Sequence, residues 1–150
     1  MKIRIHHFYD IIRDFGSGKE IKPHLYKHSY HKVAELIKSN PDLKIEIVIG
    51  ADAVCNGCIH LNNGLCDDII AYRKDFTSKE KFNNYLDQKI LKVCSIKQGE
   101  SISLAELFEK AQLYLKNIYW IYDGNDLENT KKRKENLIKG IKYLKTIKDY

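Results

Sequence analysis

The first third of the chain alternates between strand-like and helix-like patterns of apolar residues. Residues 2–5, Lys-Ile-Arg-Ile, alternate polar and apolar side chains as a short strand does, and apolar residues over 8–15 then recur at helical spacing. A second helical pattern ends at Asn40-Pro41, because proline disfavours the helical conformation of the residue before it. Residues 43–49, LKIEIVI, give the clearest strand pattern, in which β-branched residues alternate with charges. This order predicts two parallel strands joined by a helical crossover.

The chain after residue 68 shows helical patterns throughout. Thr77 with Glu80, and Ser103 with Glu106, each have the spacing of a capping box at the start of a helix. A last helix is predicted over about residues 130–149. Together these patterns predict an α+β fold. We expect a mostly helical single domain of residues 1–150 with a small two-stranded, parallel sheet.

The charge of +6 adds little to this picture, because it is concentrated at one end of the chain. Residues 131–150 contain eight Lys and Arg residues and two acidic residues, so the rest of the chain is balanced. Lysines recur every three residues opposite the apolar stripe, which is the pattern of a solvated helix face. Binding of nucleic acid by this basic C-terminal helix is the weaker alternative, because no known nucleic-acid module surrounds it.

The sequence also predicts a compartment. No apolar run approaches the ~20 residues that span a bilayer, and the N-terminus lacks the pattern of a secretory signal, so we expect a cytoplasmic protein that does not bind membranes. Thiols are kept reduced in the cytosol. The four cysteines are therefore expected to bind metal or to act in redox chemistry rather than to form structural disulfides.

Three of these cysteines form a local cluster in the loop of residues 50–68. Cys55, Cys58 and Cys66 follow the pattern C-x2-C-x7-C, and Cys94 comes 27 residues after the last of them. The turn sequence at residues 62–64, Asn-Asn-Gly, brings Cys66 back toward the first two cysteines. We expect the three thiols to converge on one metal centre in a loop that packs against the helix bearing Cys94.

The spacing of the cysteines favours an iron–sulfur cluster over zinc. Structural zinc sites usually use two short-spaced pairs of ligands, whereas Cys66 and Cys94 are far apart. Three clustered cysteines with one distant cysteine recur in iron–sulfur proteins, so a [4Fe–4S] cluster with Cys94 as its fourth ligand is the leading interpretation and Zn the alternative. If Cys94 is instead a core residue, the cluster has an open iron or takes His60 as a ligand.

Histidines are the second group of candidate site residues. His6 and His7 follow the first predicted strand, and His28 and His31 have a spacing that places them on one helical face. We consider these four as candidate catalytic acid–base groups, with Asp10 orienting an imidazole. Each histidine taken singly is better explained as a hydrogen-bonded residue between elements, and it is the group that suggests a site. With an open iron, they would serve an enzyme of desulfurase type, so the sequence leaves enzymatic activity undecided.

Four motifs resemble one known family. They are IRIHH at 3–7, IEIVIG at 45–50, the three clustered cysteines, and KQGESISLAELFEK at 97–110. This set resembles the domain of unknown function 1284 family of small bacterial and archaeal proteins over about residues 1–110. The resemblance implies an iron–sulfur cofactor and gives no reaction.

The chain departs from that family pattern at two places. Ile5 replaces the proline that precedes the histidine pair, and no further cysteines lie near Trp120. If that second cysteine group completes a site in the family, Cys94 must replace it here. We therefore expect a cytosolic protein that holds an iron–sulfur cluster and works with a redox or sulfur-handling partner. A structural-zinc domain that acts as a binding module, through its basic C-terminal helix, is the alternative.

Overall fold

The computed structural model describes residues 1–147, and confirms a mostly helical α+β fold with a small sheet. Residues 148 and 149 of the predicted C-terminal helix lie outside the described residues. The predicted parallel pair is present, with β1 (Lys2–Ile3) beside β2 (Lys44–Ile47). A third strand that we did not predict, β5 (Ser101–Ser103), pairs antiparallel with β2. The central residue of β5, Ile102, is buried opposite Ile45, which explains how so short a strand is held.

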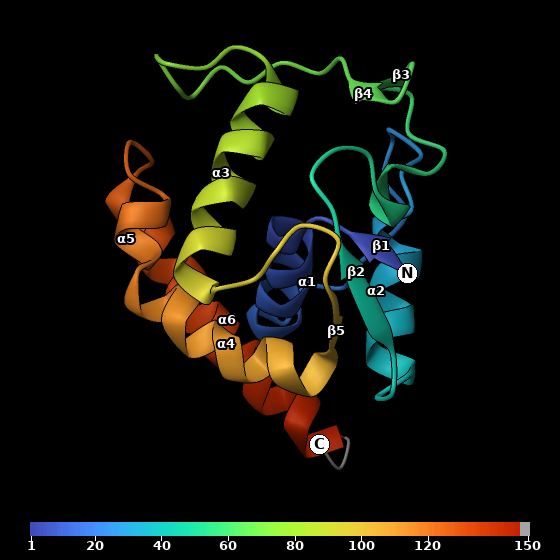
Figure 1. Cartoon of the computed structure of the whole chain (residues 1–150), viewed down its shortest axis with the longest axis vertical. Helices are drawn as coiled ribbons and strands as arrows, with labels where there is room; N and C mark the ends of the chain where they lie inside the picture. Colours follow the sequence, from blue (N-terminus) through green and yellow to red (C-terminus); the bar gives the residue numbers. More distant parts are fainter. Residues whose placement is uncertain (148–150) are drawn as a thin grey trace.

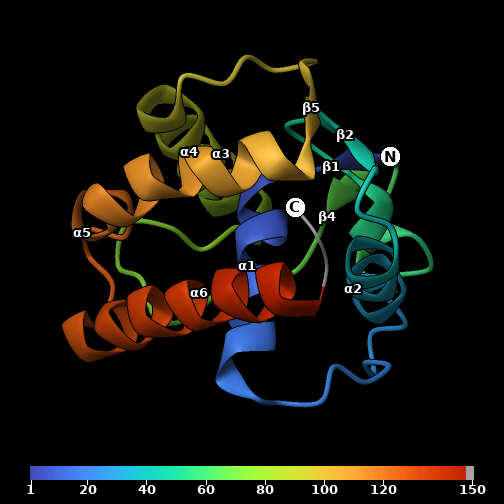
Figure 2. The same ribbon diagram turned by 90° about the horizontal axis from the view of Figure 1, so that it is seen from below.

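Helix α1 (Ile5–Ser17) runs through the middle of the molecule (Figure 1). Gly18 ends it in the left-handed conformation, with φ of 72°, which glycine adopts without steric cost. Gly16 lies inside the helix, in its last turn. Helix α6 (Leu127–Ile147) crosses α1 at this point, as the view from below shows (Figure 2). A Cβ atom on Gly16 would lie 1.7 Å from the carbonyl oxygen of Asn136, so the crossing requires glycine.

Three further helices pack around α1 and α6. They are α3 (Lys79–Cys94), α4 (Leu104–Lys116) and the short α5 (Ile118–Ile121). The capping box predicted for Ser103 and Glu106 opens α4, and both of its reciprocal hydrogen bonds are present. At α3 the prediction is wrong by one residue, because Ser78 rather than Thr77 caps the helix by accepting a hydrogen bond from the Lys81 amide.

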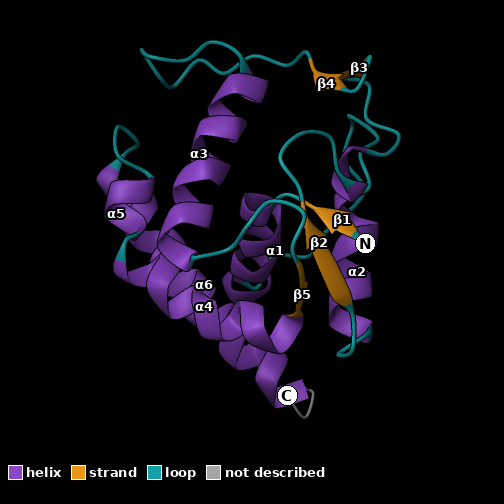
Figure 3. Cartoon of the chain, viewed as in Figure 1, coloured by secondary structure: helices purple, strands orange, loops and turns teal. Residues whose placement is uncertain are grey.

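Helix α2 (Tyr30–Ser39) lies on the other side of the sheet from α1 (Figure 1). The cysteine loop follows β2 and contains a short 3-10 helix (η1, Ala53–Cys55) and the hairpin of β3 (Leu61–Asn62) with β4 (Leu65–Cys66) (Figure 3). The buried apolar residues of the described chain form one cluster. No helix within residues 1–147 combines the length and the apolar character needed to cross a bilayer.

Candidate functional site

Three of the four cysteines line one cavity of about 70 Å³. Cys55, Cys58 and Cys66 reach it from the cysteine loop, and each is half-buried. The starts of α1 and α3 form the opposite walls. The other residues lining the cavity are Arg4, His7, Tyr26, His28, Val54, His60, Asp68, Lys79, Glu80 and Asn83. The fold therefore brings three thiols and three imidazoles to one place.

These side chains share a cavity without meeting at one point. Among the residues that the structure describes, no three His, Cys, Asp or Glu side chains are grouped closely enough to hold a metal ion. The free thiols are thus arranged around the cavity and are not already gathered into a coordination sphere.

Local turns determine how the cysteine loop is shaped. Asn63 and Gly64 both have positive φ, 49° and 77°, as the central residues of a type I′ hairpin turn do, and this turn returns Cys66 toward the cavity. Gly57, between the first two cysteines, has φ of 80°. A Cβ atom there would lie 2.8 Å from the carbonyl oxygen of Lys27, so glycine allows the segment before α2 to pack against the loop.

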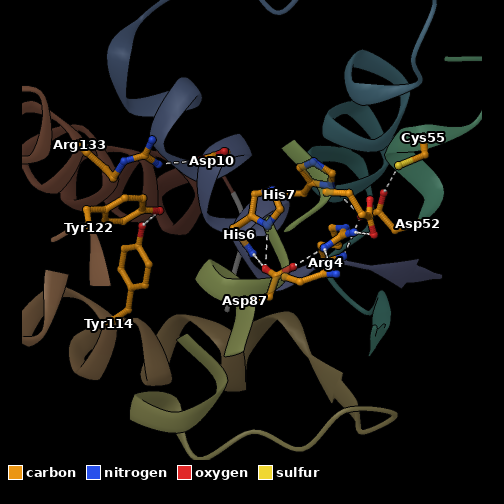
Figure 4. Close-up of polar contacts among 12 residues, drawn as sticks. Arg4, His6, His7, Asp10, Asp52, Cys55, Asp87, Tyr114, Tyr122 and Arg133 are labelled. Atoms are coloured by element: carbon orange, nitrogen blue, oxygen red, sulfur yellow. Dashed lines mark hydrogen bonds and ion pairs between the residues drawn. The ribbon is translucent and has the colours of Figure 1, made fainter. Parts of the chain in front are cut away.

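Asp52 connects the cysteine loop to the start of α1. Its Oδ2 accepts hydrogen bonds from the Arg4 amide at 2.7 Å and from Nδ1 of His7 at 2.8 Å (Figure 4). Its Oδ1 accepts from the Val54 amide at 3.1 Å and from the Cys55 thiol at 3.4 Å. A buried carboxylate thus lies between an imidazole and a thiol.

The charges of this pair are mutually stabilised. Burial disfavours the charged form of His7, but the Asp52 carboxylate more than offsets that effect and raises the pKa of His7. Burial likewise disfavours the Asp52 carboxylate, and His7 together with the hydrogen bonds lowers the pKa of Asp52 to about 2. Since Asp52 is ionised and accepts the Nδ1 proton, Nε2 is the nitrogen of His7 that remains for a ligand or a proton.

His60 is held in the same manner at the far side of the cavity. Its Nδ1 donates to Oδ1 of Asp67 at 2.8 Å, and its ring packs edge-on against Tyr26. His28 differs, because its Nδ1 accepts a hydrogen bond from the Tyr30 amide at 3.4 Å. In the neutral ring this assigns the proton to Nε2, which makes His28 a hydrogen-bond donor. The histidines His7 and His60 therefore have the orientation by a carboxylate that accompanies metal-ligating histidines.

Arg4 lines the cavity and forms two ion pairs on the inner side of the protein. Its guanidinium donates to Glu80 at 2.8 Å and to Asp87 at 2.9 Å, and Glu80 in turn accepts from the Cys66 amide at 3.2 Å. His6 donates from Nδ1 to Asp87 at 2.7 Å. The position of Cys66 is thus linked to α1 and α3 through charged groups that are almost completely buried.

Two of the thiols that line the cavity, those of Cys55 and Cys66, have raised pKa values and are protonated at neutral pH. Burial raises the pKa of Cys55 to about 12, and it also raises the pKa of Cys66. Nucleophilic cysteines have lowered pKa values, so this environment does not activate either thiol for attack on a substrate. A bound metal cation deprotonates a coordinating thiol outright, so the same environment is compatible with metal binding.

Cys94 lies apart from this cavity. It is the last residue of α3, whereas Glu80 at the start of that helix borders the cavity, and Cys94 lies 14 residue positions further on, which corresponds to about 21 Å along a helix. Its side chain is fully buried, and its thiol faces the carbonyl oxygen of Lys110 at 3.7 Å. The cysteine loop therefore packs against the helix that bears Cys94, as expected, but at the opposite end. Cys94 occupies a core position.

Two further expectations from the sequence are corrected by the contacts. His31 does not share the cavity of the cysteines but lines another with Phe15 and Tyr143. Asp10 accepts no hydrogen bond from a histidine among residues 1–147; its carboxylate accepts from Arg13 at 3.1 Å and from Arg133. Among the four catalytic candidates, only His7 and His28 border the cavity, and His6 lies just beneath it.

A family assignment follows from comparison with known proteins. The family model described as Protein of unknown function (DUF1284) matches residues 24–123, which are 100 of the 150 residues. The chain belongs to this family. The DUF1284 match covers the whole cysteine loop but begins after the motif at 3–7 and extends beyond residue 110, so its range differs from that of the resemblance. No curated protein and no solved structure matches the chain.

Sequence reasoning missed the carboxylates that organise the cavity. Asp52, Asp67 and Asp87 each accept a hydrogen bond from a histidine. Only Asp67 lies near its partner in sequence, seven residues after His60, whereas Asp52 and Asp87 are 45 and 81 residues from theirs. No local pattern signals such distant pairs. The one available signal was Asp52 itself, a charged residue in the short segment between a buried strand and the first cysteine.

Proposed function

We propose that this DUF1284 protein binds an iron–sulfur cluster through Cys55, Cys58 and Cys66. The observation that carries the proposal is the shared cavity, which gathers three cysteines beside two histidines oriented by carboxylates. The donor set fits such a group chemically, because thiolates are the usual ligands of iron–sulfur clusters and imidazole replaces them in some centres. Assembly requires the cysteine side chains to move closer together, since no three potential ligands among residues 1–147 are grouped closely enough to hold a metal ion.

The fourth ligand proposed here is His60, with an open position on iron as the alternative. His60 borders the cavity with Nδ1 engaged by Asp67, which leaves Nε2 for a ligand. Cys94 is excluded from this proposal by its distance along α3. A bound cluster would supply one-electron chemistry for a redox or sulfur-handling partner. The chain itself would contribute His7, whose Nε2 can hold a proton beside the cluster, and Lys79, whose positive charge borders the cavity.

A zinc ion is the second candidate, and the same histidine favours it. Three cysteines and one histidine form a common tetrahedral set for structural zinc. The carboxylate on Nδ1 of His60 is the partner that zinc-bound histidines typically have. In that case the cysteine loop is a structural element that becomes rigid when the metal binds.

Metal analysis of protein purified without oxygen tests these proposals. Brown protein with iron and acid-labile sulfide supports the cluster, and colourless protein with one zinc per chain supports the second candidate. Replacement of His60 by alanine is expected to reduce metal retention without unfolding the chain, because its side chain is only partly buried. Protein that retains neither iron nor zinc under these conditions contradicts both proposals.

A further inference from the structure

We propose that a second cavity, between α1 and the start of α6, binds a small phosphate ester. This cavity has a volume of about 490 Å³, within the usual size range of small-molecule sites. It is separate from the cavity of the cysteines and shares no residue with it. The residues that line it are Arg13, Lys19, Tyr72, Asn125, Asp126, Asn129, Thr130, Lys132, Arg133 and Asn136. Four cations thus face one carboxylate.

The two arginines are held in place before any ligand arrives. Asp10 accepts a hydrogen bond from Arg133 (Figure 4). It also accepts one from Arg13. The Arg133 guanidinium also stacks over the ring of Tyr122, with 4.3 Å between its central carbon and the ring centroid. A guanidinium fixed by a carboxylate and an aromatic ring loses little further freedom when it binds an anion. The arginines therefore offer preorganised donors that match a phosphate group.

Lys19 and Lys132 give this cavity positive charge that no ion pair among residues 1–147 neutralises. Asp10 and Asp14 partly neutralise the arginines, but neither Lys19 nor Lys132 forms an ion pair or a side-chain hydrogen bond among residues 1–147. An ammonium group in a concave, partly protein-enclosed position attracts anions more strongly than one on a flat surface. The cavity therefore has an excess of positive charge at the two lysines.

The remaining lining residues favour an organic ester over a bare inorganic ion. Asn125 accepts from Arg73 through Oδ1 at 2.7 Å, so its NH₂ group is the side that can donate to a ligand. Asp126, the one carboxylate of the lining, is engaged by the Asn129 amide at 2.9 Å at the start of α6. Tyr72 is 64% exposed and offers an aromatic wall for a planar or apolar group. A phosphate ester with a ring, of the size of a mononucleotide, fits this combination.

Titration calorimetry with inorganic phosphate, pyrophosphate and adenosine monophosphate tests the assignment on the full chain. We expect Lys132→Ala and Lys19→Ala each to weaken binding of the monophosphate by about tenfold, since each removes a charge-assisted contact. Neither lysine has a structural partner among the described residues, so both variants should fold. Lys131→Ala is the matched control, because Lys131 is an exposed neighbour outside the cavity and should leave binding unchanged.

The Tyr72→Ala variant distinguishes the contribution of the ligand's ring to binding from that of its phosphate group. We expect this change to weaken binding of the monophosphate and to leave binding of pyrophosphate unchanged. Absence of binding for all three probes overturns the proposal, and so does an equal effect of Lys131→Ala and Lys132→Ala. A single-stranded oligonucleotide that binds more tightly than the monophosphate, with the same dependence on Lys132, would instead assign the cavity to nucleic acid and overturn the small-ligand assignment.

Discussion

Asp87 joins the start of α1 to α3 through three buried hydrogen bonds, one from Arg4 and two from His6. Its oxygens accept from Arg4 at 2.9 Å and from His6 at 2.7 Å, and its side chain is inaccessible to solvent. A buried charge without a partner is far more costly than a buried pair. Asp87 therefore stabilises the packing of α1 against α3, and the starts of these two helices line the cavity of the cysteines.

We expect Asp87→Ala to lower the free energy of unfolding by about 3 kcal/mol, because among residues 1–147 it leaves the buried Arg4 guanidinium in an ion pair with Glu80 alone. Urea denaturation measures this change. Asp42→Ala, at an exposed turn position, is the control and should change stability by less than about 0.5 kcal/mol. A loss below about 1 kcal/mol for Asp87→Ala would show that the ion pairs around Arg4 do not hold the two helices together.

Gly57 lies where the cysteine loop packs against the segment that contains Lys27, so a substitution there tests this packing. Alanine there would be strained by φ of 80° and would also approach the Lys27 carbonyl oxygen to 2.8 Å. We expect Gly57→Ala to cost about 2 kcal/mol in stability and to reduce the metal content of the purified protein. Gly64→Ala is matched in φ, at 77°, but has open space around it, so it should cost about 1 kcal/mol. Equal losses for the two variants would argue against a packing role for Gly57.

Helices α1 and α6 cross with their backbones in close contact. A Cβ atom on Gly140 would lie 1.8 Å from the carbonyl oxygen of Ile12, and one on Gly16 would meet the backbone of α6. Both obstacles are backbone atoms, so no side-chain rotation can relieve the overlap. Helix α6, which carries most of the net positive charge of the chain, can therefore pack closely against α1 only because Gly16 and Gly140 lie at the crossing.

Gly140→Ala is expected to destabilise the protein by about 3 kcal/mol, even though alanine is the better helix former, because the helices must move apart. Thermal and urea denaturation measure the effect. Lys139→Ala, one residue earlier on the exposed side of α6, should be close to neutral. A stabilised Gly140→Ala protein would contradict the tight crossing.

The sequence predicted those elements whose signals are local. The alternation in LKIEIVI and the capping box of α4 both come from residues within a few positions of one another, and both are confirmed. Strand β5 escaped prediction because its three residues are too few to show a period and because Ser103 also caps α4. The start of α3 was shifted by one residue since two adjacent hydroxyl residues, Thr77 and Ser78, can both act as caps.

For the candidate site, too, the sequence predicted only those features that depend on neighbouring residues. The spacing of Cys55, Cys58 and Cys66 predicted a common loop, and the loop carries all three to one cavity. The role of Cys94 depends on which end of α3 meets the loop, and no local pattern carries that information. A cysteine on an apolar helix face is compatible with a ligand and with a core residue, and only the tertiary arrangement decides between them.

At the scale of the whole molecule, carboxylates that are paired with cations make the free energy of unfolding depend on pH. Burial disfavours the charged forms of Asp10 and Asp87, but their cationic partners dominate and lower the pKa of each below its usual value of 3.8. The unfolded chain consequently binds more protons than the folded chain as the pH falls below about 4. The stabilisation from these groups is complete above that pH and is lost as acid protonates them in the folded state.

We expect the free energy of unfolding to be nearly constant just above pH 5 and to fall progressively between about pH 4 and pH 2. Urea denaturation across this range measures the slope. Asp87→Ala should show a shallower decline than the parent protein, because one of the carboxylates responsible has been removed. A stability that does not change down to pH 2 would contradict the assignment of charged pairs.

The central claim is that three cysteines in one cavity hold a metal centre and that Cys94 does not take part. The most direct measurement is the iron, sulfide and zinc content of anaerobically purified Cys66→Ser and Cys94→Ser proteins beside the parent protein. We predict that the parent and Cys94→Ser proteins contain equal amounts of bound metal and that Cys66→Ser loses most of it. A loss of metal from Cys94→Ser equal to that from Cys66→Ser, or a parent protein without metal, would contradict the account.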